Sequence, residues 1–289
     1  MKLVNAKILC DHAASKGFGI PALNNNGGSY DIGRAIIEAA EELQSPLIIQ
    51  CYEPNLEYCG YDYAGMLIKF LAADTTIPMA IALDHGKTPE SVFRAVKAGF
   101  THVMIDYADQ PLEKNVRGTR EIIGIVRPLG ISVEAEIGHI IKSSDDSSAR
   151  APKVSVAEAK EFMSQVDVDL LAVAVGTTHG IFKEQHGMDF KLMSQIRSAV
   201  KPPLVLHGTC GISLKDISKC VKAGMTKINF GEGIRMNYIK YFNEFSQTMN
   251  HEHHAWRIAR AAKDRLKEDI KEIIRAVGSE GKAAQFKSK

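Results

Sequence analysis

The sequence predicts a single α/β barrel, and three observations support that fold class. Short apolar or β-branched runs alternate with helical patterns along the whole chain, without a low-complexity segment or an obvious linker. Most of these runs are continuously apolar, as expected of parallel strands that are buried on both faces. Eight such alternations within about 250 residues are typical of a TIM (β/α)8 barrel. We therefore predict one domain over residues 1–289, with a doubly wound open sheet as the main competing fold.

Eight apolar runs are the predicted strands, taken in chain order. They span Phe18–Leu23, Leu47–Gln50, Met79–Leu83, His102–Ile105, Ser132–Ile137, Leu170–Val175, Leu204–Leu206 and Lys227–Phe230. Helices are predicted between them. Apolar residues from Ile32 to Leu43 recur with helical spacing and form a single stripe. Thr88-Pro89-Glu90 offers an N-cap, a proline at the first helical position and an acidic first turn.

Two similar segments mark turns from a helix into a strand. Val96–Thr101 and Val221–Thr226 both read VKAG(F/M)T, with a helix end, a glycine stop and the start of the next strand. They lead into the fourth and eighth predicted strands, which suggests half-barrel symmetry. Beyond the eighth strand the sequence predicts extra C-terminal helices, including a charged amphipathic one from Trp256 to Val277, and a frayed tail from Gly278 onwards.

Charge and cysteine content exclude several classes of protein. Lys plus Arg number 36 against 34 for Asp plus Glu, a net charge of +2, which gives no field suited to nucleic acid or an anionic membrane. No apolar run approaches the roughly 20 residues that span a bilayer. Lys7, Asp11 and His12 interrupt the stretch where a secretory signal would be apolar. The 5 cysteines cannot all pair and form no CxxC motif, so we expect a reduced, cytoplasmic protein.

The residues with reactive side chains gather at the carboxyl ends of the predicted strands. These ends carry Asn24, Cys51, Asp84 with His85, Asp106, Glu136, His179, His207 and Asn229. In a barrel such ends converge on one mouth, where active sites lie. A lone histidine is more often structural than a metal ligand, but three histidines at three strand ends on one face favour a ligand set.

His85, His179 and His207 each precede a glycine, which lets the backbone and a ligand approach closely. Three imidazoles with an open position describe a catalytic Zn²⁺ site better than a structural one, which would favour cysteines. Asp106 and Glu136 are expected either to orient the imidazoles or to hold a metal in a second position. Asp84 would then exchange a proton with a substrate hydroxyl, although a purely supporting role for its carboxylate stays open.

These motifs resemble those of the class II, zinc-dependent ketose-bisphosphate aldolases, which include the fructose-1,6- and tagatose-1,6-bisphosphate enzymes. The similarity spans nearly the whole chain. It is carried by Phe18–Asn24, LDHG (Leu83–Gly86), MID (Met104–Asp106), SVEAEIG (Ser132–Gly138), VGTTHG (Val175–Gly180), LVLHG (Leu204–Gly208), KIN (Lys227–Asn229) and GSEGKA (Gly278–Ala283).

The resemblance implies a TIM barrel that assembles as a homodimer or homotetramer. It also implies reversible aldol cleavage of a ketose (bis)phosphate to a dihydroxyacetone (phosphate) unit and an aldehyde. Asp84 would be the catalytic residue and His85, His179 and His207 the Zn²⁺ ligands. The implied substrate-binding residues are Asn24, Cys51, Gly180, Lys183, Gly208, Cys210, Asn229, Gly231 and Glu232.

Several phosphate-facing positions depart from the family pattern. Cys210 stands where the family has a serine that touches phosphate, and Cys51 where the second strand usually ends in a serine. Glu232 replaces a phosphate-binding threonine. The loop after the fifth strand lacks the family's two glycines, and Asp145 or Asp146 would have to replace its acid.

These departures predict a substrate whose C1 end carries a hydroxyl, because a carboxylate beside a phosphate dianion is repulsive by several kcal/mol at intermediate dielectric. Alternatively, Glu232 turns outward and the backbone N–H groups of Gly231 and Gly233 still hold a phosphate. If the C1 end carries a hydroxyl, Lys142, Lys183 and Arg235 are the candidates for binding a charged group at the distal end.

Two other functions remain open at this point. One is a metal-dependent hydrolase on the same barrel, which usually has an HxH pair on its first strand; Phe18–Asn24 contains no histidine. The other is a non-catalytic accessory homologue, which would have no need to keep three histidines together with Asp84. Metal analysis followed by aldol cleavage assays would separate the three.

Overall fold

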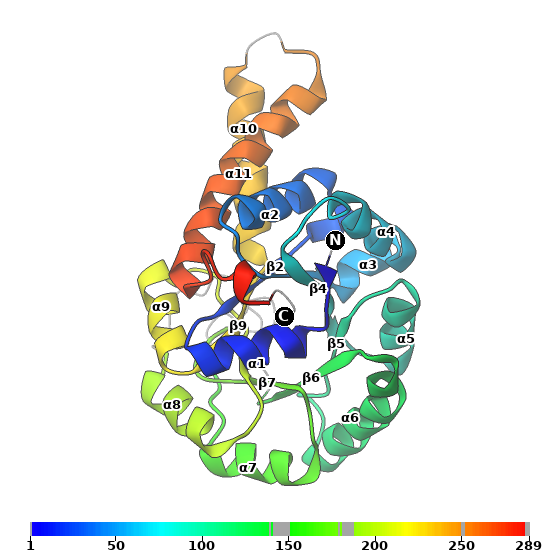
Figure 1. The fold of residues 1–289 in the computed structure, drawn as a ribbon, viewed down its shortest axis with the longest axis vertical. Coiled ribbons are helices and arrows are strands. Elements are labelled where there is room, and N and C mark those ends of the chain that lie inside the picture. The colour runs from blue at the N-terminus through cyan, green and yellow to red at the C-terminus, as the bar shows by residue number, and fades with distance from the viewer. Residues whose placement is uncertain are drawn as a thin grey trace.

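Eight parallel strands close into a barrel in the computed structural model, which describes residues 2–138, 140, 151–178, 180, 188–249 and 252–286 (Figure 1). The barrel strands are β2 (Ile20–Asn24), β3 (Leu47–Tyr52), β4 (Pro78–Gly86), β5 (His102–Ile105), β6 (Ser132–Ile137), β7 (Leu170–Val173), β8 (Leu204–Leu206) and β9 (Met225–Phe230). The ring closes because β4 pairs with β3 on one side and with β5 on the other. The predicted TIM barrel is therefore confirmed, and the open doubly wound sheet is excluded.

A ninth strand, β1 (Lys2–Leu3), was not expected from the sequence. It pairs in parallel with the start of β4, at Pro78 and Met79, where β5 has not yet begun its own pairing with β4. Five of the eight predicted strands have shifted bounds. The strand predicted to end at Leu83 continues to Gly86, and the one predicted to end at Val175 stops at Val173. The strands predicted as Phe18–Leu23, Leu47–Gln50 and Lys227–Phe230 are Ile20–Asn24, Leu47–Tyr52 and Met225–Phe230.

Helices surround the barrel in the part of the chain that the structure describes. They are α1 (Ala6–Lys16), α2 (Tyr30–Glu42), α3 (Glu53–Cys59), α4 (Tyr61–Leu71), α5 (Pro89–Lys97), α6 (Leu112–Val126), α7 (Val156–Gln165), α8 (Phe190–Ala199), α9 (Leu214–Lys222), α10 (Glu232–Thr248) and α11 (Ala255–Val277), with the 3₁₀ turns η1 (Asn26–Gly28), η2 (Arg127–Leu129) and η3 (Ala283–Phe286). None of these helices is long and apolar enough to cross a membrane.

The repeated segments end helices as predicted. Gly99 follows the end of α5 with φ 86°, and Gly224 follows the end of α9 with φ 104°. Glycine adopts this left-handed region without the steric cost that a side chain would add. Each copy then enters a barrel strand, β5 or β9.

Side chains along each strand alternate between two apolar cores. Ile49, Ile81 and Leu83 belong to the larger core, which the outer helices cover. Ile48 and Ala80 belong to a smaller core inside the barrel, where Leu9 and Cys10 of α1 also pack. The period-2 alternation of strand side chains therefore decides which residues can reach the barrel mouth.

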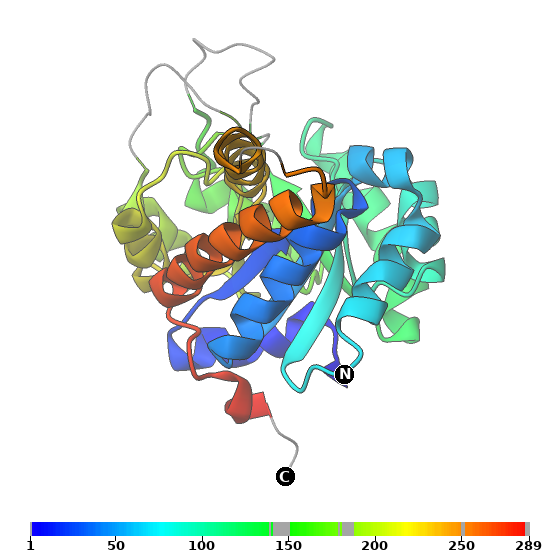
Figure 2. The same ribbon diagram turned by 90° about the horizontal axis from the view of Figure 1, so that it is seen from above.

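The C-terminal segment packs against the protein as far as Phe286, so the prediction of a frayed tail from Gly278 is wrong for those residues. Figure 2 shows the segment at the same end of the barrel as α1. Ser279 and Ala283 are buried. Side-chain hydrogen bonds join Ser45 to Ser279 (2.7 Å) and His12 to Gln285 (2.9 Å). In the backbone, the Gly281 amide donates to the Leu43 carbonyl and the Ala283 amide to the Gln44 carbonyl, both at 2.8 Å.

Candidate active site

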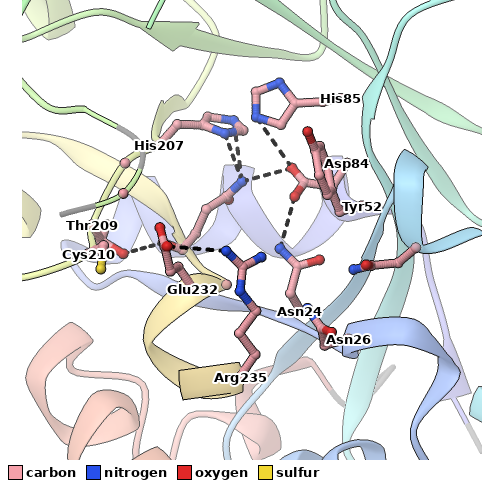
Figure 3. A pocket seen from close by; sticks show the side chains of 15 residues that line it. Asn24, Asn26, Tyr52, Asp84, His85, His207, Thr209, Cys210, Glu232 and Arg235 are labelled. Carbon is pink, nitrogen blue, oxygen red and sulfur yellow. Dashed lines mark hydrogen bonds and ion pairs between the residues drawn. The ribbon is translucent and has the colours of Figure 1, made fainter. Parts of the chain in front are cut away.

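A cavity of about 260 Å³ opens at the carboxyl ends of the strands (Figure 3). Most of its lining residues carry polar side chains, and they come from the ends of several barrel strands and the segments that follow them. They are Asn24, Asn26, Tyr52, Asn55, Asp84, His85, Gly180, His207, Gly208, Thr209, Cys210, Asn229, Gly231, Glu232 and Arg235.

Asp84 and His85 are consecutive residues, yet both line this cavity. Regular alternation would send one of them to the outer core, as it does with Leu83. The backbone of His85 instead has φ 55°, and the pairing of β4 with β5 shifts register between Leu83 and Gly86. A positive φ is uncommon for a residue with a side chain and occurs often at functional sites. This local distortion is what aims two reactive side chains into one cavity.

Two asparagines hold the Asp84 carboxylate. Asn24 Nδ2 donates to Asp84 Oδ2 at 2.9 Å, and Asn229 Nδ2 donates to Oδ1 at 3.3 Å. Because a carboxylate only accepts hydrogen bonds, these contacts fix both amides with the NH₂ group toward Asp84. The Oδ1 atoms of both asparagines are buried and have no hydrogen-bond partner within the described residues.

His85 is oriented from its far side by Asp106. Its Nδ1 lies 2.7 Å from Asp106 Oδ2, which also accepts from Lys87 Nζ at 2.7 Å. Burial lowers the pKa of His85, but the charge of Asp84 and the hydrogen bond to Asp106 outweigh it and raise the pKa to about 9. Burial, reinforced by the charge of Asp106, raises the pKa of Glu136 to about 8.

His207 is oriented by Glu134, a residue that the sequence interpretation missed. Its Nε2 lies 2.7 Å from Glu134 Oε1. Glu134 Oε2 also contacts His102 Nε2 at 3.1 Å and Lys227 Nζ at 2.9 Å, all fully buried inside the barrel. Burial acts to raise the pKa of Glu134, but Lys227 and the two imidazoles hold it well below its usual range. The signal was present in the sequence, because Glu134 and Glu136 lie two residues apart on one strand and so share its inner face.

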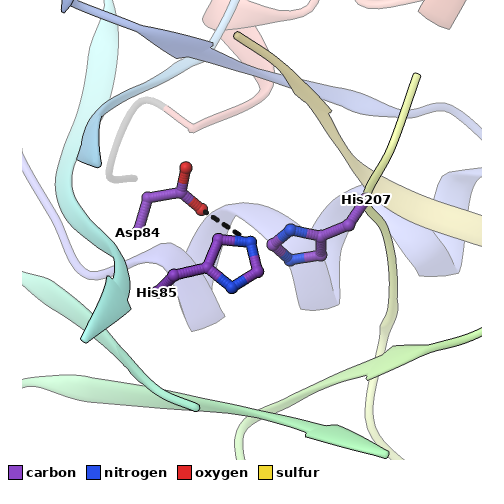
Figure 4. Close-up of side chains that lie close together, drawn as sticks. All are labelled: Asp84, His85 and His207. Atoms are coloured by element: carbon purple, nitrogen blue, oxygen red, sulfur yellow. Dashed lines mark ion pairs between the residues drawn. The ribbon is translucent and has the colours of Figure 1, made fainter. Parts of the chain in front are cut away.

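Two groups of buried side chains offer ligand atoms that lie within 4.8 Å of one another, one formed by Asp84, His85 and His207 and the other by His85, Asp106 and Glu136. Figure 4 shows the first group, with the His85 and His207 rings edge to face at 4.7 Å between centroids. Imidazole nitrogens and carboxylate oxygens are the donors that Zn²⁺ accepts. The residues present therefore fit such a cation, with His85 common to both positions.

The loops after β8 and β9 form the side of the cavity beside α10. Glu232 Oε1 lies 3.2 Å from Arg235 Nη2. Burial raises the pKa of the Cys210 thiol, and the charge of Glu232 adds to this, so Cys210 remains a weak donor. A Cβ at Gly231 would meet Asn24 Nδ2 at 3.0 Å, which explains why only glycine fits there without displacing Asn24.

One predicted site residue does not reach the cavity, and some others lie outside the described residues. Cys51 is buried in the outer core and does not line the cavity, because alternation along β3 turns it toward the helices. Its neighbour Tyr52 lines the cavity instead, with its ring 6.0 Å from that of His85. The residues outside the described part of the chain are Lys142, Asp145, Asp146, His179 and Lys183.

Apart from Tyr52, the lining residues that sequence reasoning did not find lie outside the strands. Asn26 belongs to η1, Asn55 to α3, and Thr209 follows β8. The Thr209 hydroxyl donates to the Asn229 carbonyl at 2.6 Å and so ties together the two loops beside α10. No periodic pattern marks such residues, because turn side chains point wherever the local backbone places them.

A TIM barrel whose mouth combines buried histidines with a hydrogen-bonded aspartate is typical of enzymes that act on small polar substrates. The sequence model described as "Fructose-bisphosphate aldolase class-II" matches residues 4–282. The chain belongs to this class II aldolase family and is an aldolase, a carbon–carbon lyase. The family is zinc-dependent in general. Membership sets aside both the hydrolase and the non-catalytic homologue.

The relatives match nearly the whole chain. A fructose-bisphosphate aldolase of Thermus caldophilus is 32% identical, over 97% of this chain and 100% of the relative. A sulfofructosephosphate aldolase of Alkalicoccus urumqiensis is 29% identical, over 99% of this chain and 100% of the relative. The crystal structure of the YdjI aldolase from Escherichia coli K12 matches with a TM-score of 0.86 and 28% identity, over 97% of this chain and 99% of that one.

Proposed function

We propose that this aldolase is zinc-dependent and catalyses the reversible cleavage of a ketose (bis)phosphate, or of a related anionic ketose, to a dihydroxyacetone (phosphate) unit and an aldehyde. The observation that carries the proposal is the convergence of Asp84, His85 and His207 in one cavity, with ligand atoms within 4.8 Å. The relatives named fructose-bisphosphate and sulfofructosephosphate aldolase support a phosphorylated ketose.

His85 and His207, together with His179, would hold the Zn²⁺, and Asp106 with Glu136 would offer a second cation position beside His85. When bound, Zn²⁺ polarises the ketose carbonyl and stabilises negative charge on the dihydroxyacetone unit. Asp106 fixes the ring of His85 and Glu134 that of His207, which keeps both imidazoles aimed at one point.

Asp84 would take the proton from the C4 hydroxyl while the C3–C4 bond breaks, and return it in the condensation direction. Asn24 and Asn229 hold its two oxygens and so keep it accessible to the substrate from the cavity side. Asn24, Gly180, Lys183, Gly208, Cys210, Asn229, Gly231 and Glu232 remain the proposed substrate-binding residues, and Tyr52 replaces Cys51 among them.

Metal analysis and cleavage assays test this function together. We expect about one tightly held Zn²⁺ per chain and inhibition of cleavage by EDTA. Borohydride added to the enzyme with its substrate should attach no substrate to the protein, because cleavage would not pass through a lysine Schiff base. A native protein that binds no divalent metal, or that is labelled by borohydride, would contradict the zinc assignment. Failure to cleave any ketose phosphate would contradict the reaction.

We also propose a homodimer or homotetramer. The far ends of α10 and α11 project beyond the barrel (Figure 1). Met236 and Ile239 on α10 and Trp256 on α11 are 42%, 58% and 58% exposed, and large apolar side chains exposed to this extent are available for contact with a second copy of the chain. Sedimentation at micromolar concentration would give the assembly, and a monomer would contradict it.

We propose the cytoplasm as the location, with neither nucleic acid nor a membrane as partner. All 5 cysteines are free, as expected in a reducing compartment. The near-balanced charge, +2 overall, gives no attraction to a polyanion.

A further inference from the structure

Glu232 and Arg235 form an ion pair on the first turn of α10, at the edge of the cavity. Glu232 Oε1 and Arg235 Nη2 are 3.2 Å apart, and the two side chains are 28% and 42% exposed. Figure 3 shows the guanidinium rising from α10 between Glu232 and Asn24. Arg235 is the sole lysine or arginine among the lining residues that the structure describes.

This proximity changes the expectation drawn from the sequence. From the sequence we expect Glu232 to face the C1 end of the substrate and Arg235 to bind the charged group at the opposite end. Two groups that are 3.2 Å apart would instead contact the same end of a small sugar. Whatever lies over the first turn of α10 therefore meets both charges at once.

The two charges oppose each other toward a phosphate group. A dianion at this place would be attracted by Arg235 and repelled by Glu232 over similar distances, so the pair gives it little net stabilisation. A hydroxyl group has no such conflict, because it can donate to the Glu232 carboxylate and accept from the Arg235 guanidinium.

We propose that the Glu232–Arg235 pair is a specificity determinant that binds a hydroxylated end of the ketose and disfavours a phosphate at that end. The proposal rests on the aldol cleavage proposed above. It specifies a substrate with a single anionic end, which lies away from α10. Glu232 supplies the acceptor and the repulsion, and Arg235 supplies the donor and the compensating charge.

Opposite single changes give the test. The panel is the 1-phosphate, the 6-phosphate and the 1,6-bisphosphate of both fructose and tagatose, and the measured quantity is kcat/KM for the bisphosphate relative to the better monophosphate. Wild type should favour a monophosphate. Glu232→Gln leaves Arg235 uncompensated and should raise the ratio about tenfold or more, whereas Arg235→Met should lower it by a similar factor. The double variant should return toward the wild-type ratio.

A matched control lies further along the same helix. Lys240 and Glu244 form an exposed pair at 3.9 Å that is absent from the cavity lining. Lys240→Met and Glu244→Gln make the same changes of charge and should leave the ratio unchanged. Thermal melts of all variants check that each is folded.

Calorimetry of the same sugar phosphates binding to the Asp84→Ala variant provides a readout that needs no turnover. When Glu232→Gln or Arg235→Met is added to this variant, the affinity for the bisphosphate relative to the better monophosphate should change in the same direction as the kcat/KM ratio. The proposal is overturned if wild type prefers the bisphosphate to both monophosphates, or if neither single change moves the kinetic and binding ratios. If no sugar phosphate is cleaved but the ratio of dissociation constants changes as expected, the result contradicts the proposed reaction and leaves the specificity role of Glu232 and Arg235 supported.

Discussion

Replacement of Glu134 is expected to lower the stability of the protein strongly. Its carboxylate is fully buried and contacts His102, His207 and Lys227 at the same time. At the 2.9 Å between Lys227 Nζ and Glu134 Oε2, the Coulomb attraction is about 6 kcal/mol with an effective dielectric constant of about 20. The cost of desolvating both ions offsets part of this, but removing one ion leaves the other buried alone, which costs about 3–5 kcal/mol.

Glu134→Gln keeps the side-chain volume and removes the charge, so it tests this cost without creating a cavity. We expect the free energy of unfolding to fall by about 3–5 kcal/mol and the melting temperature by about 5–15 °C. Lys227→Met should also destabilise the protein. The double variant should be more stable than the sum of the single effects predicts, because neither charge is then left alone.

Chemical denaturation and thermal melts measure the stability, and a competitive chelator measures the affinity for Zn²⁺. Loss of the hydrogen bond to His207 should weaken Zn²⁺ binding by about 10–100-fold, whereas Lys227→Met, which leaves that bond in place, should affect it less. The reasoning is refuted if Glu134→Gln unfolds within 1 kcal/mol of wild type, or if the two single effects simply add.

Three further predictions concern the site and one surface ion pair. His207→Ala should lose bound Zn²⁺ and activity together while the circular dichroism spectrum stays native; an active variant would remove His207 from the ligand set. Asp84→Ala should lower kcat by roughly 10²-fold or more with normal Zn²⁺ content, and loss of the metal would instead make Asp84 a structural support. Burial acts to raise the pKa of Glu38, but hydrogen bonds from Lys263 and Arg34 lower it on balance. Its stabilisation, about 0.5–1 kcal/mol, is therefore complete above the ordinary glutamate pKa and is lost as pH falls through the lowered one; the melting-temperature difference between wild type and Glu38→Gln should vanish on acidification.

The barrel could be predicted from the sequence because most barrel strands are short apolar runs and helical patterns alternate with them. The two VKAG(F/M)T segments even place the glycines that end α5 and α9. β1 could not be predicted in the same way, since Lys2–Leu3 is too short to show a period. It forms because the start of β4 offers an unpaired edge there.

The sequence could predict which residues lie at the ends of strands. It could not predict whether the side chain of such a residue points into the cavity or toward the outer helices. Cys51 and Tyr52 both stand near the end of β3, but the alternation of the strand sends Cys51 outward and leaves Tyr52 at the cavity. His85 breaks the same alternation through its positive φ. Register and backbone strain are set by the neighbouring strands, which a single sequence does not reveal.

The C-terminal segment provides a last prediction, because its contacts are structural and lie at the end of the barrel away from the cavity. The buried Ser45–Ser279 hydrogen bond and two backbone bonds from Gly281 and Ala283 hold it. At about 1 kcal/mol for each bond, less the chain entropy regained, deletion of residues 279–289 should cost about 1–3 kcal/mol and lower the melting temperature. Ser279→Ala should reproduce only a part of this loss. Since no residue of the segment lines the cavity, kcat/KM per folded molecule should stay at the wild-type value well below the melting temperature. A deletion variant with an unchanged melting temperature but reduced kcat/KM would mean that the segment acts on the site, and the structural account of it would be wrong.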